Sequence, residues 1–323
     1  MSNVCKKPYG EEETMEKTKG QPVGHVMAAI AICVWGSTFI FSKIMLRDFT
    51  PLQIMTMRFV VAYIVLWCLY PKVEKTTFKD NLGIFVLSLF GNTIYFLFEN
   101  NALQYTLAAN VSIIVASAPI WTAILAHFFS KGEKIRRNTI YGSALAFAGV
   151  ALVVFNGTIV LKFNPLGDIL SLGAALSWAV YSIIVVKYVN RFSSFFLMRR
   201  ATLCAMIASV PMLIISGQMD MPFECLLQKD TLFSIIFLGV LGSGVSYVLW
   251  NMATRILGVI KVNAYIYVNP FVTMITAGIF LGEPVTVMGI VGAVMIIGGV
   301  VLGVTERRSA EDVKEQTEDM TAE

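Results

Sequence analysis

The stretch that decides the fold is GNTIYFLFENNALQYTLAANVSIIVASAPIWTAILAHFFSKGEKIRRNTIYGSALAFAG, residues 91–149. A second version follows at residues 242–299, GSGVSYVLWNMATRILGVIKVNAYIYVNPFVTMITAGIFLGEPVTVMGIVGAVMIIGG. Four residue types keep the same distance from the first glycine in both: Asn100 and Asn251, Ala102 and Ala253, Val111 and Val262, Pro119 and Pro270. After a slip of one residue, both versions continue with Gly132, Glu133, Gly142 and Gly149, matched by Gly282, Glu283, Gly292 and Gly299. Such a long shared frame indicates an internal duplication.

The composition excludes an ordinary soluble domain. The 323 residues are 56% hydrophobic and 14% charged, with a mean hydropathy of +0.71, which is typical of a membrane protein. A helix needs roughly 20 apolar residues to cross about 30 Å of hydrocarbon. We therefore predict an all-α membrane protein with ten transmembrane helices, at residues 25–46, 51–71, 81–105, 106–129, 138–157, 165–187, 194–216, 232–255, 258–281 and 284–304.

The distribution of Lys and Arg predicts the orientation. These residues collect on the side that holds both chain ends, whereas the other side has only Arg47, Lys162 and Lys229. The positive-inside rule then places both termini in the cytoplasm. Because five spans per half is an odd number, we expect the second half to be inverted relative to the first. The predicted division is an N-terminal tail at 1–23, a first repeat at 24–157, a second repeat at 158–304 and a C-terminal tail at 305–323.

The segments before each duplicated stretch also correspond. The first and sixth spans match at a constant offset in Ala31 and Ala174, Trp35 and Trp178, and Ile40 and Ile183. Further short motifs are Trp35-Gly36, Gly167-Asp168 and Ser177-Trp178-Ala179. With these motifs and the doubled frame, the chain resembles EamA-type members of the drug/metabolite transporter superfamily over about residues 25–304. The resemblance implies a ten-helix exporter whose central cavity is lined mainly by the first, third, fourth, sixth, eighth and ninth helices, and it leaves the substrate open.

We select seven candidates for the cavity wall: Trp35, Tyr95, Ser112, Trp178, Tyr247, Asn263 and Tyr267. Trp35 and Trp178 lie within spans rather than in the interfacial belts where Trp is commonest. Ser112 precedes its proline at helical spacing, and Asn263 and Tyr267 do so in the other copy, so we expect one small face and one polar face that contacts the solute. The alternative for all of them is packing and hydrogen bonding between helices.

Glu99 is the only carboxylate well inside a predicted span, and Lys43 and Arg58 lie in neighbouring spans. Charges at such depth usually pair or face water. We consider two roles for Glu99: a proton-coupling or solute-gating group held by Lys43 or Arg58, or one member of a structural ion pair.

Pro119 and Pro270 lie in the middle of the fourth and ninth spans. A proline inside a helix frees the carbonyl four residues earlier, here at Val115 and Ile266, and bends the helix. The bends are either pivots for gating or inherited kinks, because membrane helices tolerate proline.

Two like-folded halves in opposite orientation are typical of secondary transporters that work by alternating access. We therefore expect a carrier in the plasma membrane, the inner membrane of a bacterium, that exports a small organic metabolite, amino-acid-like or drug-like, in exchange for protons or down its own gradient. No phosphate-binding loop for ATP appears in the sequence, and the metalloprotease, esterase and redox-dithiol motifs are absent. We expect no enzyme activity, metal, cofactor or nucleic-acid partner. The alternatives are a membrane-embedded enzyme and a channel or receptor-like scaffold.

Overall fold

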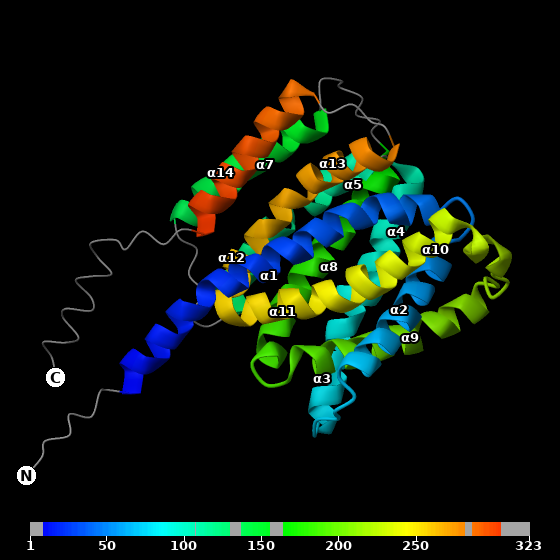
Figure 1. The fold of residues 1–323 in the computed structure, drawn as a ribbon, viewed down its shortest axis with the longest axis horizontal. Coiled ribbons are helices and arrows are strands. Elements are labelled where there is room, and N and C mark those ends of the chain that lie inside the picture. The colour runs from blue at the N-terminus through cyan, green and yellow to red at the C-terminus, as the bar shows by residue number, and fades with distance from the viewer. Residues whose placement is uncertain (1–8, 107, 130–136, 156–163, 282–285, 305–323) are drawn as a thin grey trace, which may run out of the picture.

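The computed structural model describes residues 9–106, 108–129, 137–155, 164–281 and 286–304. Every regular element in these ranges is a helix (Figure 1), which confirms the expected all-α fold class. The two Gly-Glu pairs of the duplicated frame, Gly132-Glu133 and Gly282-Glu283, lie outside the described residues.

The first half is built from eight helical elements: α1 (Tyr9–Met45), α2 (Pro51–Leu69), α3 (Phe78–Ser88), the π-helix η1 (Leu89–Ile94), α4 (Tyr95–Tyr105), α5 (Ala108–Val115), α6 (Ala118–Phe129) and α7 (Arg137–Phe155). The second half contains α8 (Pro165–Val189), α9 (Ser194–Ile215), the 3-10 helix η2 (Phe223–Leu227), α10 (Lys229–Ile236), the π-helix η3 (Phe237–Val245), α11 (Ser246–Leu257), α12 (Val259–Ala264), the 3-10 helix η4 (Tyr265–Val268), α13 (Asn269–Leu281) and α14 (Val287–Val304). These elements form ten consecutive segments at the positions of the ten expected spans.

Local chemistry sets several helix starts. Pro51 opens α2, where its missing N–H costs nothing, and Thr50 and Gln53 cap the helix end reciprocally. Pro165 opens α8 in the same way, and the Asn164 side chain accepts a hydrogen bond from the Gly167 N–H. These caps set the first residues of α2 and α8.

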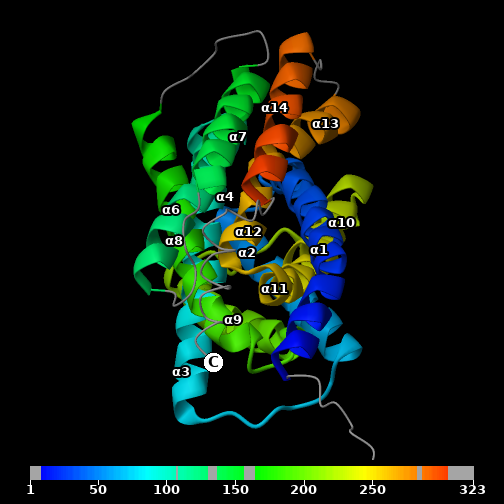
Figure 2. The same ribbon diagram turned by 90° about the vertical axis from the view of Figure 1, so that its left-hand side faces the viewer.

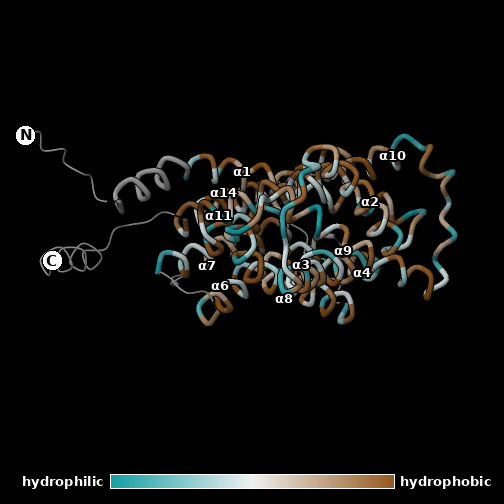
Figure 3. Tube along the Cα trace, turned by 90° about the horizontal axis from the view of Figure 1, so that it is seen from below, coloured by the Kyte–Doolittle hydropathy of each residue, from teal (hydrophilic) through white to brown (hydrophobic). Residues whose placement is uncertain are grey.

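Eight of the ten segments are long and apolar enough to cross a membrane: Gln21–Met45, Pro51–Leu69, Phe78–Tyr105, Val111–Phe129, Pro165–Val189, Ser194–Ile215, Lys229–Leu257 and Val287–Val304. The two expected spans outside this set are α7 and the interrupted run α12, η4 and α13. Hydrophobic residues dominate the helices (Figure 3), and large apolar side chains such as Ile279 and Val294 remain 72% and 66% exposed. An exposed apolar surface of this extent fits a lipid environment.

The contacts between the two halves occur in equivalent pairs. Helix α1 packs on α11, and its equivalent α8 packs on α4. Likewise α1 contacts α13 while α8 contacts α6, and the equivalent helices α2 and α9 pack on each other. Figures 1 and 2 show the last pair of equivalents, α7 and α14, lying side by side along one edge of the molecule. The duplication in the sequence therefore corresponds to an approximate two-fold arrangement of the helices.

Helices α7 and α14 run antiparallel, as their glycines show. A Cβ atom added at Gly142 would lie 2.5 Å from the Gly299 carbonyl oxygen, and one at Gly149 would lie 2.6 Å from the Gly292 carbonyl oxygen. The early glycine of one helix therefore faces the late glycine of the other. Close backbone approach at small residues is how helices associate in lipid, where no hydrophobic force drives them together.

This contact generates a prediction about two neighbouring glycines. Gly299→Ala should lower the free energy of unfolding by about 1–3 kcal/mol, because the new methyl group would lie 2.5 Å from the Ala146 nitrogen. Gly298→Ala is the matched control, since the nearest atom to its added Cβ is 4.0 Å away on Leu145. Thermal unfolding of the detergent-solubilised variants measures the difference. Equal midpoints for the two variants would show that the α7–α14 contact is looser than described.

Candidate solute-binding cavity

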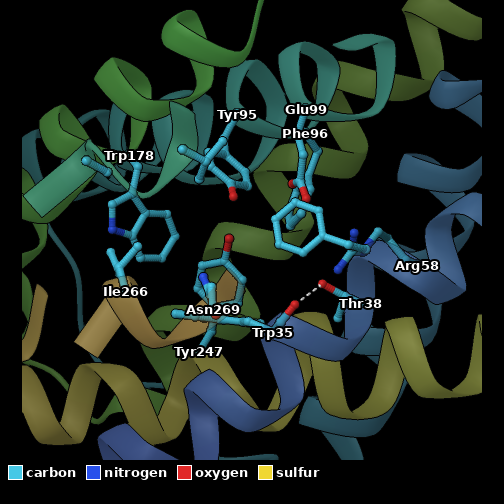
Figure 4. A pocket seen from close by; sticks show the side chains of 13 residues that line it. Trp35, Thr38, Arg58, Tyr95, Phe96, Glu99, Trp178, Tyr247, Ile266 and Asn269 are labelled. Carbon is cyan, nitrogen blue, oxygen red and sulfur yellow. Dashed lines mark hydrogen bonds between the residues drawn. The ribbon is translucent and has the colours of Figure 1, made fainter. Parts of the chain in front are cut away.

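One cavity lies between the two halves (Figure 4). Its empty space measures about 430 Å³ when the part that opens to its surroundings is included. Its lining comes from α1, α2, α4, α5, α6, α8, α11, η4 and α13: Trp35, Thr38, Phe39, Arg58, Tyr95, Phe96, Glu99, Val115, Ala118, Trp178, Tyr247, Ile266 and Asn269. All six helices that the resemblance implied contribute, and the second helix adds Arg58.

Four pairs of lining residues are equivalent in the duplication. They are Trp35 and Trp178, Phe96 and Tyr247, Val115 and Ile266, and Ala118 and Asn269. The cavity therefore lies on the approximate two-fold axis that relates the halves.

The aromatic residues form a continuous group along one side of the cavity. The ring centroids of Trp35 and Trp178 are 5.1 Å apart at an interplanar angle of 84°, and those of Trp35 and Tyr247 are 5.0 Å apart at 68°. The Tyr95 ring lies 5.5 Å from that of Trp178. Edge-to-face contacts of this kind stabilise aromatic clusters beyond the area they bury. They present a rigid, largely apolar wall to an occupant.

Two π-helical turns support this wall from opposite halves. Helix η1 contains Gly91 and η3 contains Gly242, the glycines that open the two duplicated stretches. The Tyr247 hydroxyl donates to the Gly91 carbonyl oxygen at 2.8 Å, and the Trp35 Nε1 donates to the Gly242 carbonyl oxygen at 2.9 Å. The backbone of each π-turn thus accepts a hydrogen bond from an aromatic side chain of the other half. The sequence analysis missed these turns, and the repeated glycine was the available signal.

Both expected proline bends are interruptions of helices beside the cavity. Helix α5 ends at Val115 and α6 begins at Ala118, so that Pro119 is the second residue of α6. In the other half, the 3-10 helix η4 precedes α13, and Pro270 is the second residue of α13. Val115 and Ile266, whose carbonyls the prolines leave without an i+4 N–H partner, line the cavity. A change in either bend would therefore change the cavity wall.

Arg58 and Glu99 bring two charges into the cavity. Their side chains are 1% and 3% exposed, respectively, and Figure 4 shows both charged ends turned toward the same region. The Arg58 Nε donates to the Ser243 hydroxyl at 2.7 Å, and its guanidinium lies 4.0 Å from the centroid of the Phe96 ring. Arg58 and Glu99 interact electrostatically, but no Arg58 nitrogen lies within 4.0 Å of a Glu99 carboxylate oxygen. Of the two cations considered for Glu99, Lys43 is exposed and does not line the cavity.

Three of the seven wall candidates are buried but do not line the cavity: Ser112, Asn263 and Tyr267. Asn263 lies behind the wall, where its Oδ1 accepts hydrogen bonds from the Trp178 Nε1 at 2.9 Å and from the Ser182 hydroxyl at 3.2 Å. Tyr267 belongs to a separate apolar cluster with Ala146 of α7 and Ile296 of α14. The expectation that Asn263 and Tyr267 contact an occupant of this cavity does not fit these positions.

The structure adds seven lining residues that the sequence analysis did not select: Thr38, Phe39, Phe96, Val115, Ala118, Ile266 and Asn269. Ala118 and Asn269 directly precede the repeated prolines, so the duplicated frame carried a signal for them. Thr38 and Phe39 lie one turn after Trp35 and carried no distinguishing pattern.

A bundle of membrane-spanning helices with a cavity between two related halves is typical of membrane transporters. The EamA-like transporter family matches residues 22–155 and 165–305, once in each half, and the chain belongs to this family.

Several relatives carry related descriptions. An uncharacterized transporter of Archaeoglobus fulgidus is 29% identical over 283 residues, which is 86% of this chain and 96% of that protein. A probable amino-acid metabolite efflux pump of Escherichia coli is 25% identical over 297 residues, covering 90% of this chain and 97% of that protein. One crystal structure has a similar fold, with a TM-score of 0.73 at 17% identity over 87% of this chain and 97% of that chain.

Proposed function

We propose that this protein is a secondary active transporter that exports a small organic metabolite, amino-acid-like or drug-like, by alternating access. The observation that carries the proposal is the cavity between the halves, whose lining includes four pairs of equivalent residues from the two repeats. Exchanging the conformations of two such halves would open the cavity first to one side of the membrane and then to the other. The efflux pumps among its relatives support outward transport and an amino-acid-like solute.

The proposed location is the plasma membrane, the inner membrane in a bacterium, with both termini in the cytoplasm. The excess of Lys and Arg on the side of the termini supports this orientation. The two repeats, at residues 24–157 and 158–304, would then act as the two halves that move against each other. The contact between α7 and α14, where backbones touch at glycines, would stay fixed while the helices around the cavity move, because tightly packed interfaces leave little room to rearrange.

We further propose that Glu99 carries the coupled proton. It is a buried carboxylate in the cavity, and the charged or titratable groups that interact with it are Arg58 on α2, Tyr95 on its own helix and Tyr247 on α11. A carboxylate in this position can exchange a proton with whichever side the cavity faces. Buried ionisable groups in membrane proteins mark such pathways.

The transport proposal is tested by counterflow in proteoliposomes. The labelled solute is the metabolite that most raises the unfolding temperature of the detergent-solubilised protein in a library screen, since a bound ligand stabilises the folded state. A carrier accumulates external label against an internal excess of the same unlabelled solute and slows when the trans solute is removed. An enzyme or a scaffold gives no counterflow, and a channel gives no dependence on trans solute.

If the proline bends act as pivots, replacing either proline should slow transport. Pro119→Ala and Pro270→Ala should each slow counterflow severalfold, because an uninterrupted helix is stiffer beside the cavity. Pro211→Ala is the control, since Pro211 lies inside α9, is exposed and does not line the cavity. If both cavity-side variants exchange solute at the rate of the unmodified protein, the bends are inherited kinks.

If Glu99 carries the coupled proton, a variant of Glu99 should lose the solute accumulation that a pH gradient drives but should keep solute exchange. In the unmodified protein, an imposed pH gradient should drive uptake of the labelled solute above its external concentration. Glu99→Gln should lose this pH-driven accumulation, because the amide does not ionise, and Glu224→Gln, at an exposed position in η2, should keep it. Accumulation by Glu99→Gln with an unchanged dependence on pH would exclude Glu99 as the proton carrier.

A further inference from the structure

The cavity contains two opposite charges that do not satisfy each other. The Arg58 Nη2 and the Glu99 Oε2 are buried and have no hydrogen-bond partner. The two side chains interact electrostatically, yet their nitrogen and oxygen atoms stay more than 4.0 Å apart. The Asn269 Oδ1, also in the lining, is a third buried polar atom without a partner. Unpaired buried polar groups cost free energy and call for an explanation.

The surrounding structure holds the two charges apart. The bond from Arg58 to Ser243 and the contact of its guanidinium with Phe96 fix the position of the cation. Glu99 projects from α4 toward the same space (Figure 4). A direct ion pair would satisfy both groups at once, so the separation leaves each with unused hydrogen-bonding capacity directed at the cavity.

These charges also break the two-fold relation of the cavity. At the constant offset of the duplicated stretch, Trp250 corresponds to Glu99. Among the described residues that line the cavity, the second half contributes no charged side chain. The paired aromatic and apolar positions form the wall in both halves, so the wall does not require the charges. Their presence in one half points to recognition of an occupant that itself has two different ends.

We propose that the solute is a zwitterion whose carboxylate binds Arg58, whose ammonium group binds Glu99, and whose apolar or aromatic remainder packs against Trp35, Trp178 and Tyr247. The proposal rests on the transport function proposed above and names the substrate class of the same cavity. A carboxylate accepts from the free guanidinium nitrogen, and an ammonium group donates to the Glu99 and Asn269 oxygens. A solute with only one charge would leave the other buried charge unpaired, and a fully apolar solute would leave both.

The first test needs no variant. Labelled L-phenylalanine and L-leucine are offered in counterflow, with four unlabelled competitors: each amino acid's methyl ester, which lacks the carboxylate charge, and each N-acetyl derivative, which lacks the ammonium group. The unmodified zwitterions should compete at least about tenfold better than either derivative, because each deleted charge removes a charge-assisted hydrogen bond. Equal competition by the derivatives would overturn the proposal.

Two variants then assign each end of the solute. Arg58→Gln should remove the preference for the zwitterion over its methyl ester and keep the preference over the N-acetyl derivative. Glu99→Gln should do the reverse. A purely structural pair would lower transport of all competitors together, so the crossed change in selectivity distinguishes recognition from stability. Arg200→Gln, on α9 and outside the cavity lining, should leave both preferences unchanged.

The outcomes separate this inference from the transport function. If neither amino acid exchanges while another library metabolite with one charge or none shows counterflow, the protein is a carrier and the zwitterion assignment is wrong. If no metabolite shows counterflow, the transport function fails and the assignment fails with it. If a variant does not fold, as judged by its unfolding temperature, the competitor series on the unmodified protein still decides.

Discussion

The structure depends on one constraint, which is that backbone polar groups inside the hydrocarbon layer must find partners within the protein. Uninterrupted helices satisfy this constraint on their own, but this chain interrupts its helices around the cavity. At the two π-turns, the Gly91 and Gly242 carbonyls accept from Tyr247 and Trp35 of the opposite half. Within the uninterrupted helix α1, the Gly36 carbonyl also accepts a hydrogen bond from the hydroxyl of Thr273 on α13, at 2.7 Å. The irregular backbone of each half is therefore stabilised by side chains of the other half. The cavity lies beside these hydrogen bonds between the halves.

Much of the architecture could be predicted because it depends on composition and periodicity. The apolar segments, their number and the duplication are properties of the sequence itself, and the shared cavity of Trp35, Trp178, Tyr95, Tyr247, Arg58 and Glu99 follows from the chain positions of those residues. The π-turns could not be predicted, because π-helix and α-helix differ by one hydrogen-bond register and have no distinct residue pattern. The repeated glycines marked the place without specifying the geometry.

The place of Tyr267 could not be predicted from helical spacing. At α-helical spacing, Asn263 and Tyr267 share one face, which led to the expectation that both contact a solute. In the structure Ile266 lines the cavity, and Tyr267 packs with residues of α7 and α14. Their equivalents in the first half are placed alike, since Val115 lines the cavity and Ala116 belongs to the cluster that contains Tyr267. Helical spacing shows which residues share a face, but the neighbour that this face meets depends on how the two halves pack.

Two of the contacts between the halves differ in chemistry, and the difference fits the proposed transport mechanism, in which one contact stays fixed and the other rearranges. At α7 and α14, glycines bring backbones into direct contact and leave no space for rearrangement. At the cavity, the halves meet through aromatic rings, interrupted helices and unpaired polar atoms. An Arg58 and a Glu99 that satisfied each other would make the empty protein more stable and would leave nothing to bind an occupant. Keeping them apart lowers the stability of the empty cavity, and that same difference in free energy is what a solute of the right charge would recover on binding.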